Sequence, residues 1–95
     1  MLSLISPSNM SADVAKRARA MRLAQNLSQR SLAERAGVSE ASLKRFEGTG
    51  AIAFSTLVQI AAALGCMDDL AALFAARQVV SIDEIAKKRR LRGRG

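Results

Sequence analysis

The sequence predicts an all-α protein, with one small five-helix domain at residues 11–76 and a basic C-terminal segment after it. Apolar residues make up 49% of the 95 residues, whereas aromatic residues make up only 3%. A core that relies on Ala, Leu and Ile instead of aromatic rings requires closely packed helices. Apolar residues also recur at the helical spacings of three and four positions, and no alternating strand pattern competes with them. A chain of this length is sufficient for one domain.

The first helix is expected over residues 11–27, after a flexible N-terminus at residues 1–10 that carries no charge. Ser11 is a suitable N-cap, because its hydroxyl can accept a bond from a free backbone N–H group of the first turn. Three apolar residues at i, i+4 and i+7 then share one face: Val14, Ala18 and Met21.

Two shorter helices follow, and a serine precedes each of them. The second helix is expected from a cap at Ser28 to about Ala36. The third is expected from a cap at Ser39 to about Glu47. Gly37 lies between them and suits a turn residue with a positive φ.

A loop that contains two glycines leads to the fourth helix, which is expected to open at Ser55 or Thr56 and to end at Gly65. Its apolar face repeats at helical spacing: Leu57, Ile60, Ala61 and Leu64. The fifth helix is expected to have Asp68 or Asp69 as its cap. Its buried face is expected to contain Leu70, Leu73 and Phe74.

Residues 77–95 are expected to form a short helical or extended C-terminal arm and a disordered basic tail. Val79 and Val80 favour an extended link, whereas Ser81-Ile82-Asp83-Glu84 has the spacing of a capping box and favours a further helical turn. The last nine residues, KKRRLRGRG, hold six cations and no acid. The whole chain has a net charge of +7, so residues 1–86 carry only +1.

The segment from Gln29 to Gly48 has the pattern of two short helices that cross near a right angle. Ala33 supplies the small side chain that the crossing point needs, and Gly37 supplies the turn. Five apolar residues stand where the inner faces require them: Leu32, Ala36, Val38, Leu43 and Phe46. This spacing indicates a helix-turn-helix, in which the second helix of the pair lies in the DNA major groove.

Residues 13–65 resemble the Cro/C1-type (XRE-like) helix-turn-helix family through LSQ, LAERAGVS, the Glu-Gly pair after the third helix, and TLVQIAAALG. The resemblance implies a lambda repressor-like domain that binds double-stranded DNA. It also implies that Gln29 bonds a DNA phosphate and braces the third helix. Finally, it implies that Arg22 and Glu47 form a structural ion pair.

Two positions depart from the usual pattern of that family. Asn26 stands where glycine is usual, and asparagine tolerates the left-handed conformation that glycine would adopt. Gly48-Thr49 stands where Asn-Gly is usual. The second departure weakens the expectation of a phosphate contact at that point.

The outward face of the third helix carries the side chains that are expected to contact bases. Lys44 and Arg45 can donate to guanine O6 and N7 or to phosphates, and Glu40 can accept from cytosine N4. Ala41 could contact a thymine methyl group. Alternatively, Glu40 and Lys44 could form an ordinary i, i+4 surface pair, and Ser39 could act only as a cap. The expected base-contacting set is Ser39, Glu40, Ala41, Ser42, Lys44 and Arg45.

Phosphate contacts are expected from two regions. Ser28 and Gln29 open the second helix, although both would also suit an ordinary helix start. The tail could hold phosphates or enter a minor groove through Lys87, Lys88, Arg89 and Arg90. Alternatively, it could bind an acidic protein, or remain a solvated end. A membrane-surface role is disfavoured, because an amphipathic helix with bulky apolar anchors is missing.

Composition argues against catalysis and against metal binding. The chain has no His and a single cysteine, Cys66, so we expect no imidazole chemistry, no intrachain disulfide, no metal and no cofactor. The sequence offers neither a nucleophile–base pair nor a carboxylate pair, so we expect that the protein is not an enzyme. No signal peptide or membrane span is expected, and a cytoplasmic, nucleoid-associated location in a bacterium or phage host follows.

These observations predict a sequence-specific transcriptional regulator, a repressor that binds an inverted-repeat operator as a homodimer. The dimer surface is expected within residues 57–74, with an exchanged arm at residues 79–85. One alternative is an antitoxin that neutralises a HipA-type kinase toxin and represses its own operon, because the C-terminal residues resemble such regulators in composition. A general nucleic-acid or RNA binder is disfavoured, since stacking aromatic residues are missing.

Overall fold

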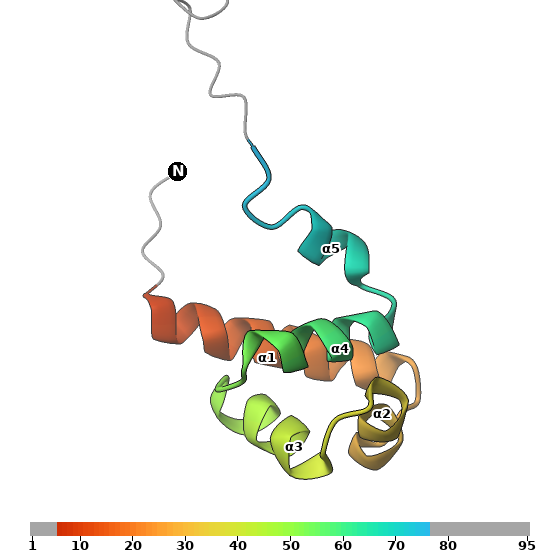
Figure 1. Cartoon of the computed structure of the whole chain (residues 1–95). Coiled ribbons are helices and arrows are strands. Elements are labelled where there is room, and N and C mark those ends of the chain that lie inside the picture. The colour runs from red at the N-terminus through yellow and green to blue at the C-terminus, as the bar shows by residue number, and fades with distance from the viewer. Residues whose placement is uncertain (1–5, 77–95) are drawn as a thin grey trace, which may run out of the picture.

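The computed structural model describes residues 6–76, and every regular element in this range is an α-helix. In chain order the helices are α1 (Pro7–Ala24), α2 (Gln29–Ala36), α3 (Glu40–Thr49), α4 (Phe54–Leu64) and α5 (Met67–Ala71). Helices α2 and α3 lie on one side of α1 and α4, and α5 lies on the other side (Figure 1). The protein therefore has the predicted all-α, five-helix fold. The expected arm and tail, including Val79, Val80 and residues 81–95, lie outside the described residues.

Helix α1 begins four residues earlier than the apolar pattern predicts. Ser6 is its N-cap and accepts a bond from the backbone N–H of Asn9 at 3.1 Å, and Pro7 occupies the first turn. Proline is favoured there because its fixed φ suits a helix and the first turn needs no N–H partner. The expectation that Ser11 is the cap is therefore wrong, as is the expected flexibility of residues 7–10, which are helical.

The C-terminal end of α1 is also earlier than expected, at Ala24 instead of residue 27. Asn26 ends the turn in the left-handed region, with φ 58°. The chain then continues to Leu27, which is only 7% exposed. Asn26 thus adopts the left-handed conformation that a glycine would adopt at this position, as the family resemblance predicts.

The core is formed by one phenylalanine and by small and aliphatic side chains, mostly from α1, α2, α3 and α4. Its largest fully buried side chains are Phe46, Leu32, Leu43 and Ile60. Ala15 and Ala33 are also buried, and their small size allows the helices to approach one another closely. Val14 and Ala18 pack against this core from α1, whereas Met21 is 41% exposed.

The boundaries of the last two helices differ from those that the sequence suggests. Helix α4 begins at Phe54, one residue before Ser55, and its N-cap Ala53 makes no side-chain bond. Helix α5 begins at Met67, so that Asp68 and Asp69 lie within its first turn instead of capping it.

The expected buried face of α5 is wrong for two of its three members. Leu70 is half-buried, but Leu73 is 46% exposed and Phe74 is 95% exposed. The physical reason is that α5 ends at Ala71, so the helical periodicity does not extend to Phe74. Phe74 instead has a positive φ of 57°, which directs the chain away from the helix path.

A glycine holds the end of α3 close to α1. Gly50 is the C-cap of α3 and is left-handed, with φ 82°. A Cβ atom added there would lie 2.8 Å from the carbonyl carbon of Ser11. The loop after α3 can therefore approach the α1 backbone only because this position has no side chain.

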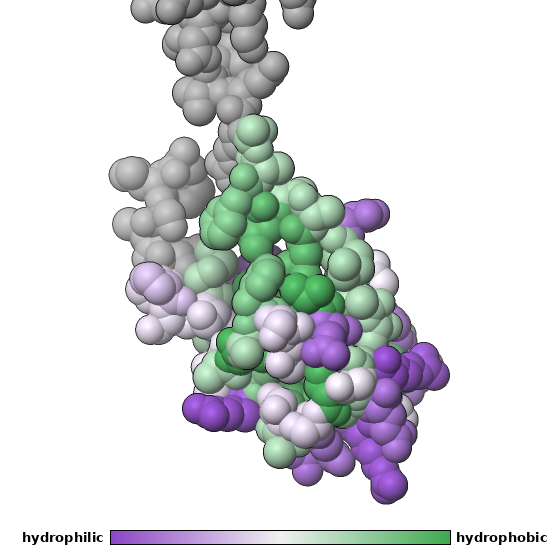
Figure 2. All heavy atoms as spheres, in the orientation of Figure 1, coloured by the Kyte–Doolittle hydropathy of each residue, from purple (hydrophilic) through white to green (hydrophobic). Residues whose placement is uncertain are grey.

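The surface is divided by polarity. Hydrophobic side chains gather over α4 and α5, and hydrophilic side chains gather at the end of the molecule where α2 and α3 lie (Figure 2). The two ends of this domain therefore offer different surfaces to a partner.

Candidate DNA interface

Helices α2 and α3 form the predicted helix-turn-helix. Ala33, at the crossing point, is 3% exposed, and Gly37 is the left-handed C-cap of α2 with φ 70°. Leu43 and Phe46 anchor α3, with exposed fractions of 0% and 1%. Because these two residues fix the inner side of α3, the residues between them face outward.

Serine caps hold the first turns of both helices, as predicted. The Ser28 hydroxyl oxygen accepts from the backbone N–H of Ser31 at 3.0 Å, and the Ser39 hydroxyl oxygen accepts from that of Ser42 at 3.1 Å. Each capping hydroxyl also donates to the hydroxyl of the serine three residues later. These bonds order the first turns of α2 and α3 without any ligand.

The expected base-contacting residues line the outward side of α3. Ala41, Ser42, Lys44 and Arg45 are exposed, and Glu40 is half-buried. The Lys44 Nζ lies 3.3 Å from the Glu40 Oε2, so the alternative surface pair is present in the free protein. Such an exposed i, i+4 pair is worth only about 0.3–0.5 kcal/mol, and a stronger acceptor can displace it.

A shallow pocket of about 290 Å³ lies beside α3. Ser42 and Arg45 line it from α3, residues 51–53 line it from the following loop, and Thr56 lines it from the first turn of α4. Arg45 is therefore at the edge of the outward face, next to the loop. Sequence reasoning did not anticipate this pocket, because residues 51–53 are apolar and carry no recognisable motif.

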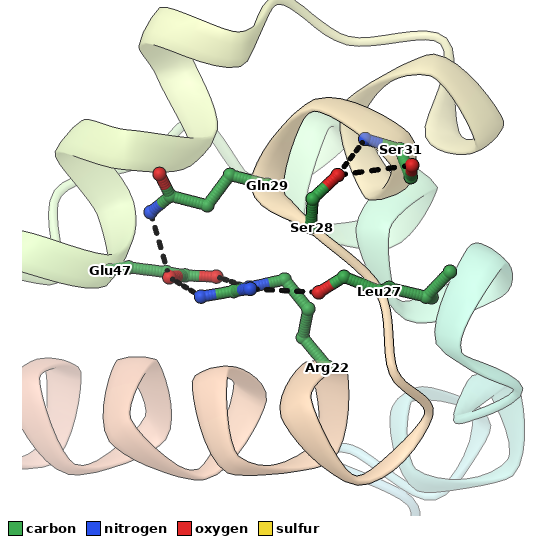
Figure 3. A network of polar contacts seen from close by, with 6 residues as sticks. All are labelled: Arg22, Leu27, Ser28, Gln29, Ser31 and Glu47. Carbon is green, nitrogen blue, oxygen red and sulfur yellow. Dashed lines mark hydrogen bonds and ion pairs between the residues drawn. The ribbon is translucent and has the colours of Figure 1, made fainter.

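A buried ion pair holds the C-terminal end of α3 against α1, as the family resemblance implies. The Arg22 Nε donates to the Glu47 Oε2 at 2.8 Å, and the Arg22 Nη2 donates to the Glu47 Oε1 at 2.9 Å (Figure 3). The two side chains are only 7% and 4% exposed. The remaining guanidinium nitrogen, Nη1, donates to the carbonyl of Leu27 at 2.8 Å. The pair thus connects α1, the turn after it, and α3.

Gln29 links this ion pair to the start of α2. Its Nε2 donates to the Glu47 Oε1 at 3.0 Å, as Figure 3 shows. An amide nitrogen carries two hydrogens, so this bond leaves one donor for another acceptor. Gln29 is half-buried, so its side chain lies partly at the surface between the start of α2 and the end of α3.

The electrostatics of the ion pair favour the charged form of both partners. The bond to Glu47 raises the pKa of Arg22 above its ordinary value, although burial opposes the shift. Burial acts to raise the pKa of Glu47, but bonds from Arg22 and Gln29 and the positive charges of Arg22 and Arg19 outweigh it. The pKa of Glu47 therefore lies below its ordinary value.

Arg19 is a candidate for a phosphate contact that sequence reasoning missed. It is exposed, lies one turn before Arg22 on α1, and is close enough to Glu47 for its charge to lower the pKa of that carboxyl. No acidic side chain of residues 6–76 forms an ion pair with it. The i, i+3 spacing from Arg22 could have identified it, because residues three apart share a helix face.

The described residues do not reach the tail, so the expected phosphate contacts at Lys87, Lys88, Arg89 and Arg90 lie outside the described structure.

Within residues 6–76, no three His, Cys, Asp or Glu side chains are grouped to hold a metal ion. In the same range, no single helix is both long and apolar enough to cross a membrane. Taken together, α3 and α4 meet that length and composition, but they are bent by 96°.

The sequence matches a family model described as a helix-turn-helix domain over residues 13–74. The match covers more than half of the chain and includes all of α2, α3 and α4, with most of α1. The protein therefore belongs to this helix-turn-helix family, and its five helices agree with the Cro/C1 type. A search of the curated proteins finds no match. A helix-turn-helix domain indicates a DNA-binding regulator, and domains of this family are typically non-enzymatic.

Proposed function

We propose that the protein is a repressor that recognises an inverted-repeat operator as a homodimer. The observation that carries this proposal is that α3 is fixed at both ends while most of its outward side chains remain exposed to solvent. The Ser39 cap orders its first turn, and the Arg22–Glu47 pair holds its last turn. A recognition helix needs such support, because misplaced side chains cannot reach base edges with good geometry.

Lys44 is proposed to contact guanine, and Arg45 to contact guanine or a phosphate at the edge of the groove. Both are exposed and can donate to O6 and N7 of guanine. Glu40 and Ser42 are proposed to contact neighbouring bases, Ala41 a thymine methyl group, and Ser39 the base beside the cap. Separation of Lys44 from Glu40 on binding costs little, because their pair is exposed.

Gln29, Ser28 and Arg19 are proposed to bind phosphates beside the groove. The second hydrogen of the Gln29 amide is available, and the first backbone N–H groups of α2 attract an anion. Arg19 adds a positive charge on the neighbouring helix. A phosphate bound to Gln29 would also act on the position of α3, because the same amide holds Glu47.

A homodimer is proposed because a single domain makes few base contacts. Two domains related by a two-fold axis place their recognition helices about 34–36 Å apart, which is one turn of DNA. The operator is then an inverted repeat.

The experiment that tests this proposal is selection of binding sites by the purified full chain from a pool of random-sequence duplexes. We expect enrichment of an inverted repeat whose half-sites are separated by one helical turn. Recovery of unrelated sequences, with no enriched half-site, would contradict sequence-specific recognition. Recovery of single half-sites would contradict the homodimer but not sequence-specific recognition.

The tail is proposed to bind phosphates without sequence preference. Its six cations would neutralise several phosphates, and each neutralised phosphate contributes about 0.9 to the log–log salt slope of binding. Truncation after Ala86 should therefore weaken binding to all duplexes alike and reduce the slope by up to about 5. An unchanged slope would refute this role.

No contact within residues 6–76 favours the antitoxin alternative over the regulator.

A further inference from the structure

Helix α3 carries a negative charge on the side that the proposed function turns toward DNA. Within residues 40–49, which the structure describes in full, Glu40 is the one acidic residue on the outward side. Glu47, the other acidic residue of this helix, is buried in its pair with Arg22. A carboxylate that approaches the phosphates of a duplex weakens binding unless a cation or a base donor offsets its charge. The presence of Glu40 on this face therefore needs a partner.

Lys44 is that partner in the free protein. Its Nζ lies 3.3 Å from the Glu40 Oε2, and the two side chains are 60% and 41% exposed. The corresponding pair of α2, between Arg30 and Glu34, is looser, with atoms 3.8 Å apart and side chains 79% and 70% exposed. Glu40 also lies in the first turn of α3, where free backbone N–H groups favour a carboxylate. The start of α3 thus presents a cation and an anion side by side.

The major-groove edge of a G·C base pair has the complementary pattern. Guanine presents N7 and O6 as acceptors, and the amino group at cytosine N4 is a donor beside O6. Because a hydrogen bond of the base pair joins O6 to N4, these atoms are about 2.9 Å apart. The separation of the Lys44 Nζ from the Glu40 Oε2 is similar. An exposed pair is worth little by itself, so the two groups can widen slightly to align with the base edge.

We infer that Glu40 and Lys44 together read one G·C base pair. Lys44 donates to O6 and N7 of the guanine, and Glu40 accepts from the N4 amino group of the paired cytosine. This inference rests on the proposed DNA recognition and states which base pair the start of α3 specifies. The two charges stay adjacent in the complex, so the carboxylate does not face the phosphates alone.

The same chemistry ranks the four base pairs. A T·A pair also places an acceptor, thymine O4, beside a donor, adenine N6, but it offers a methyl group to Lys44 and a second acceptor, N7, to Glu40. In C·G and A·T pairs the central donor and acceptor are reversed, so each charge faces the wrong group. The expected order is G·C, then T·A, then the two reversed pairs. A lysine that acts alone can turn to the acceptor of a reversed pair and produces no such order.

Exchange of the two charges tests the inference, because it reverses the order of donor and acceptor on α3. The double variant Glu40→Lys/Lys44→Glu should select C·G from random-sequence duplexes at the position where the wild type selects G·C. In fluorescence anisotropy, each protein should bind its own duplex about 10-fold more tightly than the duplex of the other. The matched control Arg30→Glu/Glu34→Arg exchanges the pair of α2 and should leave the selected base pair unchanged. Circular dichroism should show equal helix content in all three proteins.

A modified base tests the wild type without any substitution in the protein. N4-methylcytosine still pairs with guanine, but a methyl group replaces the amino hydrogen that faces the major groove. This base, placed in the selected pair, should weaken wild-type binding by about 5-fold or more. Glu40→Ala has no acceptor at that point and should bind the modified and unmodified duplexes equally well. Equal binding of both duplexes by the wild type would overturn the inference.

The outcomes separate this inference from the proposed function. An inverted repeat without a G·C position, or with one that does not follow the charge exchange, would overturn the inference and leave operator recognition intact. Failure of the wild type to select any sequence would contradict operator recognition and, with it, the inference. If the double variant does not fold, the duplex with N4-methylcytosine decides the inference with the wild type alone.

Discussion

Arg22 and Glu47 form a bidentate pair between α1 and the last turn of α3, although they are 25 positions apart in the chain. All the nitrogens of the guanidinium have acceptors, and both carboxylate oxygens have donors. A buried ion pair in which each nitrogen and each oxygen is hydrogen-bonded is costly to break, because the remaining partner keeps an uncompensated charge. The pair therefore matters more for the position of α3 than any exposed charge of the domain.

Arg22→Ala should destabilise the protein by about 3–5 kcal/mol, since it leaves the Glu47 carboxylate buried without its partner. The measurement is the free energy of unfolding from urea titration followed by circular dichroism. Arg17→Ala is the matched control, because it removes an exposed i, i+4 pair with Asp13 on the same helix. The control should cost less than about 1 kcal/mol. Equal effects of the two substitutions would contradict a structural role for the buried pair.

The stability of the protein should depend on the ionisation of Glu47. The folded-state pKa of this carboxyl lies below its ordinary value of 4.5. Its contribution to stability is therefore complete above about pH 4.5 and is lost as the pH falls through the lower, folded-state pKa. The free energy of unfolding, measured between pH 7 and pH 3, should fall less steeply for Glu47→Gln than for the wild type. Parallel curves for the two proteins would refute the assignment.

Two glycines near the end of α3 should respond oppositely to alanine. Gly48 lies within the helix with no atom within 4 Å of an added Cβ, so Gly48→Ala should stabilise by about 0.5–1 kcal/mol. Gly50 has φ 82°, and an added Cβ would meet the Ser11 backbone at 2.8 Å, so Gly50→Ala should destabilise by about 2 kcal/mol or more. Thermal unfolding of both variants measures the effects. A stabilising Gly50→Ala would show that α3 and α1 do not approach this closely.

Lys44 and Arg19 should differ in how their removal changes DNA binding. Lys44→Ala should cost about 1–3 kcal/mol on the selected operator and relax the preference at one base pair, because it removes a base contact. Arg19→Gln should weaken binding to operator and unrelated DNA alike, and should reduce the log–log salt slope by about 0.9. Fluorescence anisotropy with both duplexes at several salt concentrations measures these effects. A uniform loss for Lys44→Ala would place that side chain on a phosphate instead.

Local signals predicted the centre of the fold correctly. Ser28, Ser39 and Gly37 act through groups within four positions in the chain, so their capping roles follow from the sequence itself. The burial of Leu43 and Phe46 follows from helical periodicity. The Arg22–Glu47 pair is different, because it joins distant residues, and only the resemblance to a known family anticipated it.

The wrong predictions lie where the local signals compete. At the start of α1, both Ser6-Pro7 and Ser11 are acceptable helix starts, and the apolar pattern begins too late to choose between them. α4 begins without any side-chain cap, so its first residue follows from packing and not from a motif. For Phe74, periodicity placed the ring on a buried face, whereas the short length of α5 leaves it outside the helix.

The sequence placed the expected base-contacting residues on the outward side of α3, where the structure leaves most of them exposed, but their separate roles could not be derived. Whether Arg45 would meet a base or a phosphate depends on how α3 enters the DNA major groove, which in the proposed homodimer depends on a second copy as well as on this domain. The contribution of Arg19 was missed for a related reason. Its proximity to Glu47 arises from the packing of α1 against α3, which periodicity alone does not describe.

The brevity of α5 has a consequence for the order in which parts of the domain open. Its five residues include none that is buried, and it lacks a side-chain cap, so its backbone bonds break at little cost to the rest of the core. Amide hydrogens of α5 should exchange with solvent far faster than those of α2 and α3, whose apolar sides are buried in the core. α5 is thus a local unfolding unit, and a partner that packed against it would slow amide exchange on the side of the domain away from α2 and α3.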